Sequence, residues 1–275
     1  MSGSMKSQQS ATLSQTSVPL VILAGGLGTR MGLLTENVPK PMLEIHGRPM
    51  LLHIMLHYAH FGVTEFHILA GYKSGYIKDY FASLVRNFCS IRLTYGKAYA
   101  STVKTLEDEY KIKDWNVFVH ETGYNSKTGE RLKRIKDFLP NDFYFTYGDS
   151  LSDFDPRLGL ADLRDHKATV AICAVTRGER FGSVSIDGGS KVIRFQEKIS
   201  SSEAWINGGF MSVSSKIFEF ITGTNDSFES DVIPRVVQLG QVSAVKHSGF
   251  WTAIDHEREL SAINSSEWLP WQNTT

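Results

Sequence analysis

The sequence is short of net charge, cysteine and long apolar runs. Its 29 lysines and arginines balance 29 aspartates and glutamates, so no overall field draws it toward nucleic acid or an acidic membrane. The two cysteines, Cys89 and Cys173, lack metal-ligand spacing; this argues against a disulfide framework and favours a reducing compartment. No apolar run approaches the roughly 18 residues of a membrane span. We therefore expect a soluble, cytoplasmic protein without a nucleic-acid or membrane partner.

The order of apolar segments along the chain indicates an α/β protein. Residues 1–17 are rich in Ser, Gln and Thr and carry no secretory pattern, so we expect a disordered tail. From Val18 onward, β-rich runs alternate with helical patterns, which predicts a mainly parallel sheet covered by helices. No linker or repeat interrupts the rest, so residues 18–275 should form one domain. The predicted strands are 19–25, 65–72, 116–122, 142–149, 169–176, 191–198 and 241–247, and the predicted helices are 49–62, 74–88, 129–139, 215–221 and 229–240.

The first predicted strand ends in a glycine loop, LAGGLGTR, at residues 23–30. Such a loop can hold a dinucleotide, the phosphates of an NTP in a P-loop, or an NTP bound in another way. Gly26, Gly28 and Gly32 are spaced one residue too widely for the dinucleotide fingerprint, and prolines within 39–41 interrupt its crossover helix. No lysine followed by Ser or Thr comes after the last glycine, which excludes a Walker A loop. A backbone turn that approaches an NTP closely remains.

Two cations follow this loop. Arg30 offers a fork of donors for phosphate oxygens, and Lys40, between Pro39 and Pro41, offers a point charge. Because the chain has no net charge, a polyphosphate would have to be held by local charges of this kind. A tight turn with a surface arginine and lysine would give the same pattern, so these residues alone leave both interpretations open.

LAGGLGTR followed by PKPMLEIHGRPML resembles the N-terminal signature of sugar-phosphate nucleotidyltransferases. HIMLHYAHFG, AGYKSGYIKDYF, SKTGERLKR, FTYGD, RFQEK, INGGF and GFW followed by Asp255 are similar to the glucose-1-phosphate cytidylyltransferase branch, from about Val18 to Trp268. The resemblance implies a three-layer, Rossmann-like, mixed but mainly parallel sheet of the nucleotide-diphospho-sugar transferase type. It also implies a commonly oligomeric enzyme that joins an NTP, here CTP, to a sugar 1-phosphate, here glucose 1-phosphate, giving CDP-glucose and pyrophosphate.

Two aspartates are the candidate metal ligands. Joining two anions requires charge neutralisation, and Mg²⁺ usually takes one or two carboxylates together with phosphate oxygens. Asp149 ends the predicted strand 142–149, directly after its aromatic run. It should therefore lie at the sheet edge where open α/β sheets bind ligands. An aspartate there could also open a turn. Asp255 sits where a helix N-cap belongs, and the resemblance implies that it is the second ligand. We therefore expect Mg²⁺ on Asp149 and Asp255.

The resemblance also assigns the other site residues. Ser126 and Arg131 are expected to select the pyrimidine, and the backbone of Leu23 and Ala24 to read the other edge of the base. Arg30, Lys40 and Asp149 are the expected catalytic groups. The nucleotide set is Leu23, Ala24, Gly25, Gly26, Gly28, Thr29, Arg30, Ser126, Arg131 and Gly148, and the sugar-phosphate set is Lys40, Glu197, Lys198, Asn207 and Gly208.

Three residues depart from the family pattern. Ser150 replaces a glycine after the metal aspartate, Glu130 replaces a glycine before the arginine of RLKR, and Ile199 replaces a proline after Glu-Lys. None of them removes a charged catalytic group. They leave open another base or acceptor, with dTTP, UTP or GTP in place of CTP, and a non-catalytic nucleotide-sugar-binding protein.

Overall fold

The structure is a computed structural model, and it describes part of the chain. Side chains are described for residues 18–84, 115–176, 205–267 and 269, and backbone alone for residues 85–88, 91–94, 97–100, 183–186 and 192–196. The predicted tail at 1–17, Cys89, and the predicted site residues Glu197 and Lys198 with neighbouring Ile199 lie outside the described residues.

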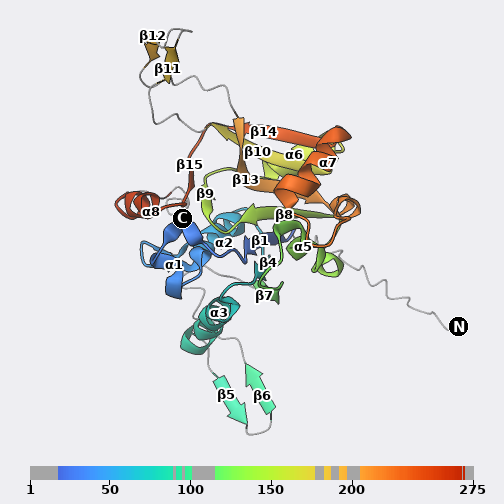
Figure 1. Cartoon of the computed structure of the whole chain (residues 1–275). Coiled ribbons are helices and arrows are strands. Elements are labelled where there is room, and N and C mark those ends of the chain that lie inside the picture. Colours follow the sequence, from blue (N-terminus) through green and yellow to red (C-terminus); the bar gives the residue numbers. More distant parts are fainter. Residues whose placement is uncertain are drawn as a thin grey trace, which may run out of the picture.

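A seven-stranded sheet forms the centre of the molecule (Figure 1). Its order is β14-β10-β13-β8-β1-β4-β7. All neighbouring pairs are parallel except those of β13, which runs antiparallel to both β8 and β10. The predicted mixed, mainly parallel sheet is therefore confirmed. The strands are β1 Leu20–Ala24, β4 Glu65–Ala70, β7 Asn116–Glu121, β8 Asp142–Tyr147, β10 Val170–Thr176, β13 Trp205–Ser214 and β14 Val242–His247.

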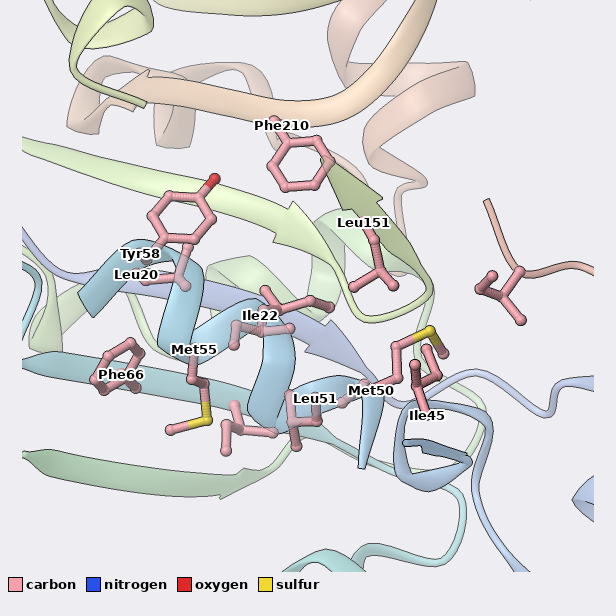
Figure 2. Packing of buried hydrophobic residues seen from close by; sticks show 14 of the residues in the cluster. Leu20, Ile22, Ile45, Met50, Leu51, Met55, Tyr58, Phe66, Leu151 and Phe210 are labelled. Carbon is pink, nitrogen blue, oxygen red and sulfur yellow. The ribbon is translucent and has the colours of Figure 1, made fainter. Parts of the chain in front are cut away.

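Alternation of side chains along β1 shows that both faces of the sheet are covered. Leu20 and Ile22 belong to one core with Met55 and Tyr58 of α2 (Figure 2). Val21 and Leu23 point to the other face, into a core completed by α5 and α7. The architecture has three layers, as predicted. The α-helices are α1 Leu34–Asn37, α2 Met50–His60, α3 Ser74–Phe88, α5 Thr128–Lys133, α6 Pro156–Asp165, α7 Ile233–Gln238 and α8 Glu257–Asn264.

Several predicted helices are shorter or wound differently. The segment 129–139 divides into α5 and a 3-10 turn at Lys136–Phe138, and 215–221 is a 3-10 helix, Ser215–Phe220. The segment 229–240 begins as a π-helix, Phe228–Val232, before α7. Strand β13 and helix α6 were not predicted, because the Asn-Gly-Gly of β13 is untypical of a central strand. The start of α6 did carry a signal, an Asp N-cap followed by proline.

Among the described residues, four two-stranded sheets lie outside the central one. The pair β9–β15 lies next to both predicted metal ligands, because β9 directly follows Asp149 and β15 ends two residues before Asp255. Strand β12 falls within the predicted segment 191–198 and pairs with β11. The small strands are β2 Glu44–Ile45, β3 Arg48–Pro49, β5 Ile91–Thr94, β6 Lys97–Ala100, β9 Ser150–Ser152, β11 Ser183–Ile186, β12 Val192–Gln196 and β15 Trp251–Ala253.

Two further expectations concern the cysteines and the length of apolar helices. Cys173 is buried and unpaired, and burial raises the pKa of its thiol to about 12, as expected of an ordinary core cysteine. Within the described part of the chain, every helix is too short or too polar to cross a membrane.

Two buried histidines of α2 make stability depend on pH. The Nε2 atom of His53 lies 2.8 Å from the Ile45 carbonyl oxygen, and that of His57 lies 2.8 Å from the Phe154 carbonyl oxygen. Burial lowers the pKa of each imidazole to about 4. An unfolded histidine takes up its proton near pH 6.5, so between pH 6.5 and 4 the unfolded state binds more protons. The free energy of unfolding is therefore highest above pH 6.5 and decreases as the pH falls toward 4.

We expect each histidine to lower the free energy of unfolding by about 2 kcal/mol between pH 7 and pH 5. Urea denaturation at both pH values measures the difference, and His57→Gln should reduce it by about half because one titrating group is removed. Equal unfolding free energies of the wild type at the two pH values would contradict the prediction.

Candidate functional site

A cleft of about 600 Å³ opens at one edge of the central sheet. Strands β1 and β8 end there, and β13, which runs the opposite way, begins there. This is the edge at which open α/β sheets bind ligands. The predicted site residues that line the cleft are Leu23, Ala24, Gly25, Gly26, Gly28, Thr29, Arg30, Lys40, Ser126, Arg131, Gly148, Asp149, Asn207, Gly208 and Asp255.

The glycine loop forms one wall of this cleft. Gly28 has φ 65°, in the left-handed region that favours glycine, and precedes a single 3-10 turn at Thr29–Met31. A Cβ on Gly28 would lie 3.1 Å from side-chain carbons of both Lys40 and Thr35, and the Thr35 hydroxyl donates to the Gly28 carbonyl over 3.0 Å. The loop is thus packed against the segment that carries Lys40, which brings the two parts of the sequence signature together.

A second glycine brings Asp149 to the same place. The Gly148 amide donates to the Leu23 carbonyl over 2.9 Å, which extends the pairing of β8 with β1. A Cβ on Gly148 would lie 2.8 Å from that carbonyl oxygen and 3.0 Å from Pro41 Cγ, so a larger residue would push the strand end away. The Tyr-Gly-Asp sequence therefore places Asp149 beside Lys40.

The β9–β15 pair brings Asp255 to Asp149. Ser150 pairs with Ala253, and the Ile254 amide donates to the Asp149 carbonyl over 2.9 Å. The N-cap of α8 is His256, not Asp255. The capping explanation of Asp255 is therefore wrong, and its carboxylate has a different partner.

That partner is Lys40, which lies between the two aspartates. Its Nζ is 2.7 Å from Asp149 Oδ2 and 2.9 Å from Asp255 Oδ1, and Arg30 Nη1 lies 3.1 Å from the same Asp255 oxygen. The Lys40 side chain is 11% exposed, whereas that of Arg30 is 69% exposed. Burial alone would raise the pKa of Asp255, but the hydrogen bond and charge of Lys40, with Arg30, outweigh it and lower that pKa. The two carboxylates thus converge on the Lys40 ammonium group, and Arg30 adds a second cation beside Asp255.

This arrangement fits a hard divalent cation. The two carboxylates converge on the Lys40 ammonium group, so the space between them favours a positive charge. Their donor atoms are oxygens, the ligand atoms that Mg²⁺ prefers. Within the described residues, His, Cys, Asp and Glu do not gather in threes or more at any metal-like site. Two carboxylates are, however, the usual protein share of a Mg²⁺ site completed by substrate phosphates and water.

Arg131 is buried in the wall of the cleft, on the side predicted to bind the nucleotide. Its guanidinium donates to the carbonyl oxygens of Ala70 at 3.2 Å and Gly25 at 3.0 Å, and to the hydroxyl of Thr122 at 2.7 Å. Burial, and then repulsion by Arg134, lower the pKa of this group. Arg131 therefore ties together the ends of β1 and β4, in addition to facing the region where the base is expected.

The side of the cleft predicted to bind the sugar begins at the start of β13. The Asn207 Oδ1 accepts from the Gly209 amide over 2.8 Å, and the Trp251 indole donates to the Gly208 carbonyl over 2.7 Å. Gly209 has φ 84°, and a Cβ there would lie 2.6 Å from the Tyr147 ring. These contacts hold the polar side chain of Asn207 beside the main chain of Gly208 and Gly209. The predicted partners Glu197 and Lys198 lie outside the described residues.

The cleft is also lined by residues that were not among the predicted site residues. Tyr147 and Trp251 stand inside motifs quoted above, FTYGD and GFW, so attention to the whole motif would have found them. Glu229 carries no such signal, because its segment was predicted to be an ordinary helix. The additional lining residues are Pro41, Lys127, Thr128, Tyr147, Ser150, Gly209, Glu229, Trp251 and Ala253.

Comparisons with known proteins point to one family. Residues 20–264 match the family described as nucleotidyl transferase. The chain is 35% identical over 258 residues to the glucose-1-phosphate cytidylyltransferase of Salmonella typhi, across 92% of this chain and 98% of that protein. It is 33% identical over 246 residues to a Bacillus subtilis protein named "probable glucose-1-phosphate cytidylyltransferase", across 89% and 94%. The crystal structure of HddC from Yersinia pseudotuberculosis has a TM-score of 0.64 at 25% identity, across 90% and 98%. The chain therefore belongs to the nucleotidyl transferase family.

Proposed function

We propose that this nucleotidyltransferase joins CTP to glucose 1-phosphate, giving CDP-glucose and pyrophosphate. The observation that carries the reaction class is the convergence of Asp149, Asp255, Lys40 and Arg30 beside the glycine loop. The choice of CTP and glucose 1-phosphate is supported by relatives at 35% and 33% identity that bear this activity in their names.

The reaction is a direct displacement at phosphorus. A phosphate oxygen of glucose 1-phosphate forms a bond to the α-phosphorus of CTP, and the bond from that phosphorus to the oxygen bridging to the β-phosphate breaks. The bridging oxygen leaves with the pyrophosphate. A phosphate monoester near neutral pH is already an anionic nucleophile, so no side chain has to remove a proton.

The chain supplies positive charge and alignment for this step. Arg30, which is exposed, would bind the departing pyrophosphate, and Lys40 would bind the reacting phosphates. Enzymes of this family generally use a divalent metal, and we propose Mg²⁺ held by Asp149 and Asp255. Bound there, the metal would neutralise negative charge on the α-phosphate. Lys198 would assist at the sugar phosphate and Glu197 at the sugar hydroxyls, as the resemblance implies.

Two of the departures from the family pattern, Ser150 and Glu130, leave the contacts of Lys40 and Arg30 with the two aspartates intact. Ser150 Oγ lies 3.4 Å from Asp149 Oδ1 and pairs through β9 with β15, so it supports the aspartate. Glu130 pairs with Arg134 over 3.1 Å. Neither change supports a non-catalytic protein. A homo-oligomeric state, a cytoplasmic location and a single domain over 18–275 stay predictions.

A substrate panel tests the function. Purified protein with Mg²⁺ is given each of CTP, dTTP, UTP and GTP with each of several sugar 1-phosphates, and pyrophosphate release is followed. We expect CTP with glucose 1-phosphate to give the highest kcat/KM. Preference for another pair would retain the reaction class and overturn the specificity, whereas no release with any pair would overturn both.

A further inference from the structure

The carboxylate of Glu229 faces the cleft from an unusual turn. It belongs to the five-residue π-helix Phe228–Val232, a widened turn of a kind that is frequent at functional sites. The turn is fixed at its start, because the Ser227 amide donates to Asp231 Oδ2 over 2.7 Å. The Phe228 amide donates to the Thr128 hydroxyl over 2.8 Å, which joins the turn to α5. Glu229 itself is exposed and lines the cleft.

Hydroxyl groups supply the hydrogen bonds that this carboxylate accepts within the described residues. Tyr147 donates to Oε1 over 2.8 Å. Thr128 and Ser227 donate to Oε2 over 2.6 Å and 2.9 Å. The donors come from three segments of the chain, so their geometry is set by the fold. Burial, and then the Glu229 charge, raise the pKa of Tyr147, which keeps its hydroxyl protonated as a donor.

The two carboxylate oxygens differ in remaining capacity. Each can accept about two hydrogen bonds. Oε2 already accepts two from the described residues, whereas Oε1 accepts one, from Tyr147. Oε1 therefore has room for one more donor, and Glu229 lines the cleft from which a ligand could supply it. Three hydroxyl groups already donate to this carboxylate, and a hydroxyl of a ligand would supply a fourth hydrogen bond.

The position of Glu229 lies between the two halves of the cleft. Through Thr128 it is bonded to the loop that carries Ser126 and leads to Arg131, on the nucleotide side. Through Tyr147 it is bonded to a ring that packs against Gly209, on the sugar side. A ligand reaching from one side to the other passes this carboxylate.

We propose that Glu229 Oε1 accepts a hydrogen bond from a sugar hydroxyl of a substrate and so makes the enzyme specific for that hydroxyl. The proposal rests on the proposed function, because both of its substrates carry sugar rings. The hydroxyl can come from the ribose of the NTP or from the hexose of the sugar 1-phosphate, and the shared chemistry is a neutral hydroxyl donating to the carboxylate. Glu229 thereby becomes a specificity residue of the cleft.

The test combines a variant with substrates that lack single hydroxyls. Wild type and Glu229→Gln are compared with CTP and its 2′-deoxy and 3′-deoxy analogues, and with glucose 1-phosphate and its 2-, 3-, 4- and 6-deoxy analogues. With the full substrates we expect Glu229→Gln to lower kcat/KM by roughly 10- to 100-fold, the range for a hydrogen bond to a charged group. With one analogue the variant and the wild type should differ by less than about threefold, because the bond is missing in both. The arm in which this occurs identifies ribose or hexose as the source.

Two controls make the result specific. Glu219→Gln alters an exposed carboxylate on the 3-10 helix Ser215–Phe220 and should leave all substrates unaffected. Glu229→Asp keeps the charge but moves it back by one methylene, and should show the same loss with the full substrates and the same near-absence of a loss with that one analogue. An equal loss with every substrate in both Glu229 variants would assign Glu229 a structural role and overturn the proposal. Wild type that uses all the deoxy analogues as well as the full substrates would overturn it without any variant. Pyrophosphate release from CTP and glucose 1-phosphate by the wild type would still stand as evidence for the proposed function.

Discussion

Replacing Asp149 with asparagine is expected to lower kcat roughly a thousandfold while the protein remains folded. The substitution keeps the size of the side chain but removes one of the two charges proposed to hold the metal. Stabilisation of charge by a bound metal contributes several kcal/mol to lowering such a barrier. The fold should tolerate the change, because Lys40 keeps Asp255 as a partner at 2.9 Å and is not left as an unpaired buried cation.

Steady-state pyrophosphate release and thermal unfolding, measured on the same preparations, test this expectation. Asp137→Asn is a matched control, because Asp137 is exposed on the 3-10 turn Lys136–Phe138 and lies away from the lining of the cleft. It should keep wild-type kcat. Near-normal turnover by a folded Asp149→Asn variant would remove Asp149 from the mechanism.

Features that depend on neighbouring residues in the sequence could be predicted well. The apolar run of β1 followed by LAGGLGTR identified a strand ending in a ligand loop, and the extra spacing up to Gly32 excluded the dinucleotide alternative. The aromatic run before Gly148 predicted a strand that would deliver Asp149 to the sheet edge. Both expectations rest on chain geometry over a few residues, and the structure brings both loops to one cleft.

Features that depend on distant partners could not be predicted from local patterns. That Lys40 lies between Asp149 and Asp255 follows from the pairing of β9 with β15, and nothing near Lys40 in the sequence encodes that pairing. Glu229 was hidden for a related reason. Its segment has helical residue types, but it is wound as a π-helix and is hydrogen-bonded to Thr128, about a hundred residues earlier in the chain.

Arg131 illustrates the same limit and has the second large expected effect. The resemblance assigned it to base selection, yet its guanidinium is bonded to the protein itself, at Gly25, Ala70, Thr122 and Tyr124. Three of these acceptors are main-chain carbonyls close to the ends of β1, β4 and β7. An uncharged replacement such as methionine would remove this donor from all four acceptors, and each lost bond to a charged group costs about 1–3 kcal/mol. The Ala70 carbonyl would still accept from the Thr122 amide and hydroxyl, and the Gly25 carbonyl from the Tyr72 amide over 3.4 Å.

We expect Arg131→Met to lower the free energy of unfolding by about 3 kcal/mol or more, and to weaken CTP binding. The cost is smaller than the sum over four bonds, because burial already disfavours the guanidinium, as its lowered pKa indicates. CTP binding should weaken because Arg131 anchors the Gly25 carbonyl, and Gly25 is part of the wall of the cleft. Arg131→Lys should be intermediate, since an ammonium group has three donors and cannot match the planar fork.

Urea denaturation and the CTP-dependent rise in melting temperature measure the two effects separately. Arg134→Met is the matched control. Arg134 is the neighbouring exposed arginine, paired with Glu130 one helical turn away, and an exposed pair of this kind contributes less than about 1 kcal/mol. If Arg131→Met unfolds at the same urea concentration as Arg134→Met, the buried guanidinium does not support the strand ends. A normal stability with lost CTP binding would instead assign Arg131 to the base alone, as the resemblance implied.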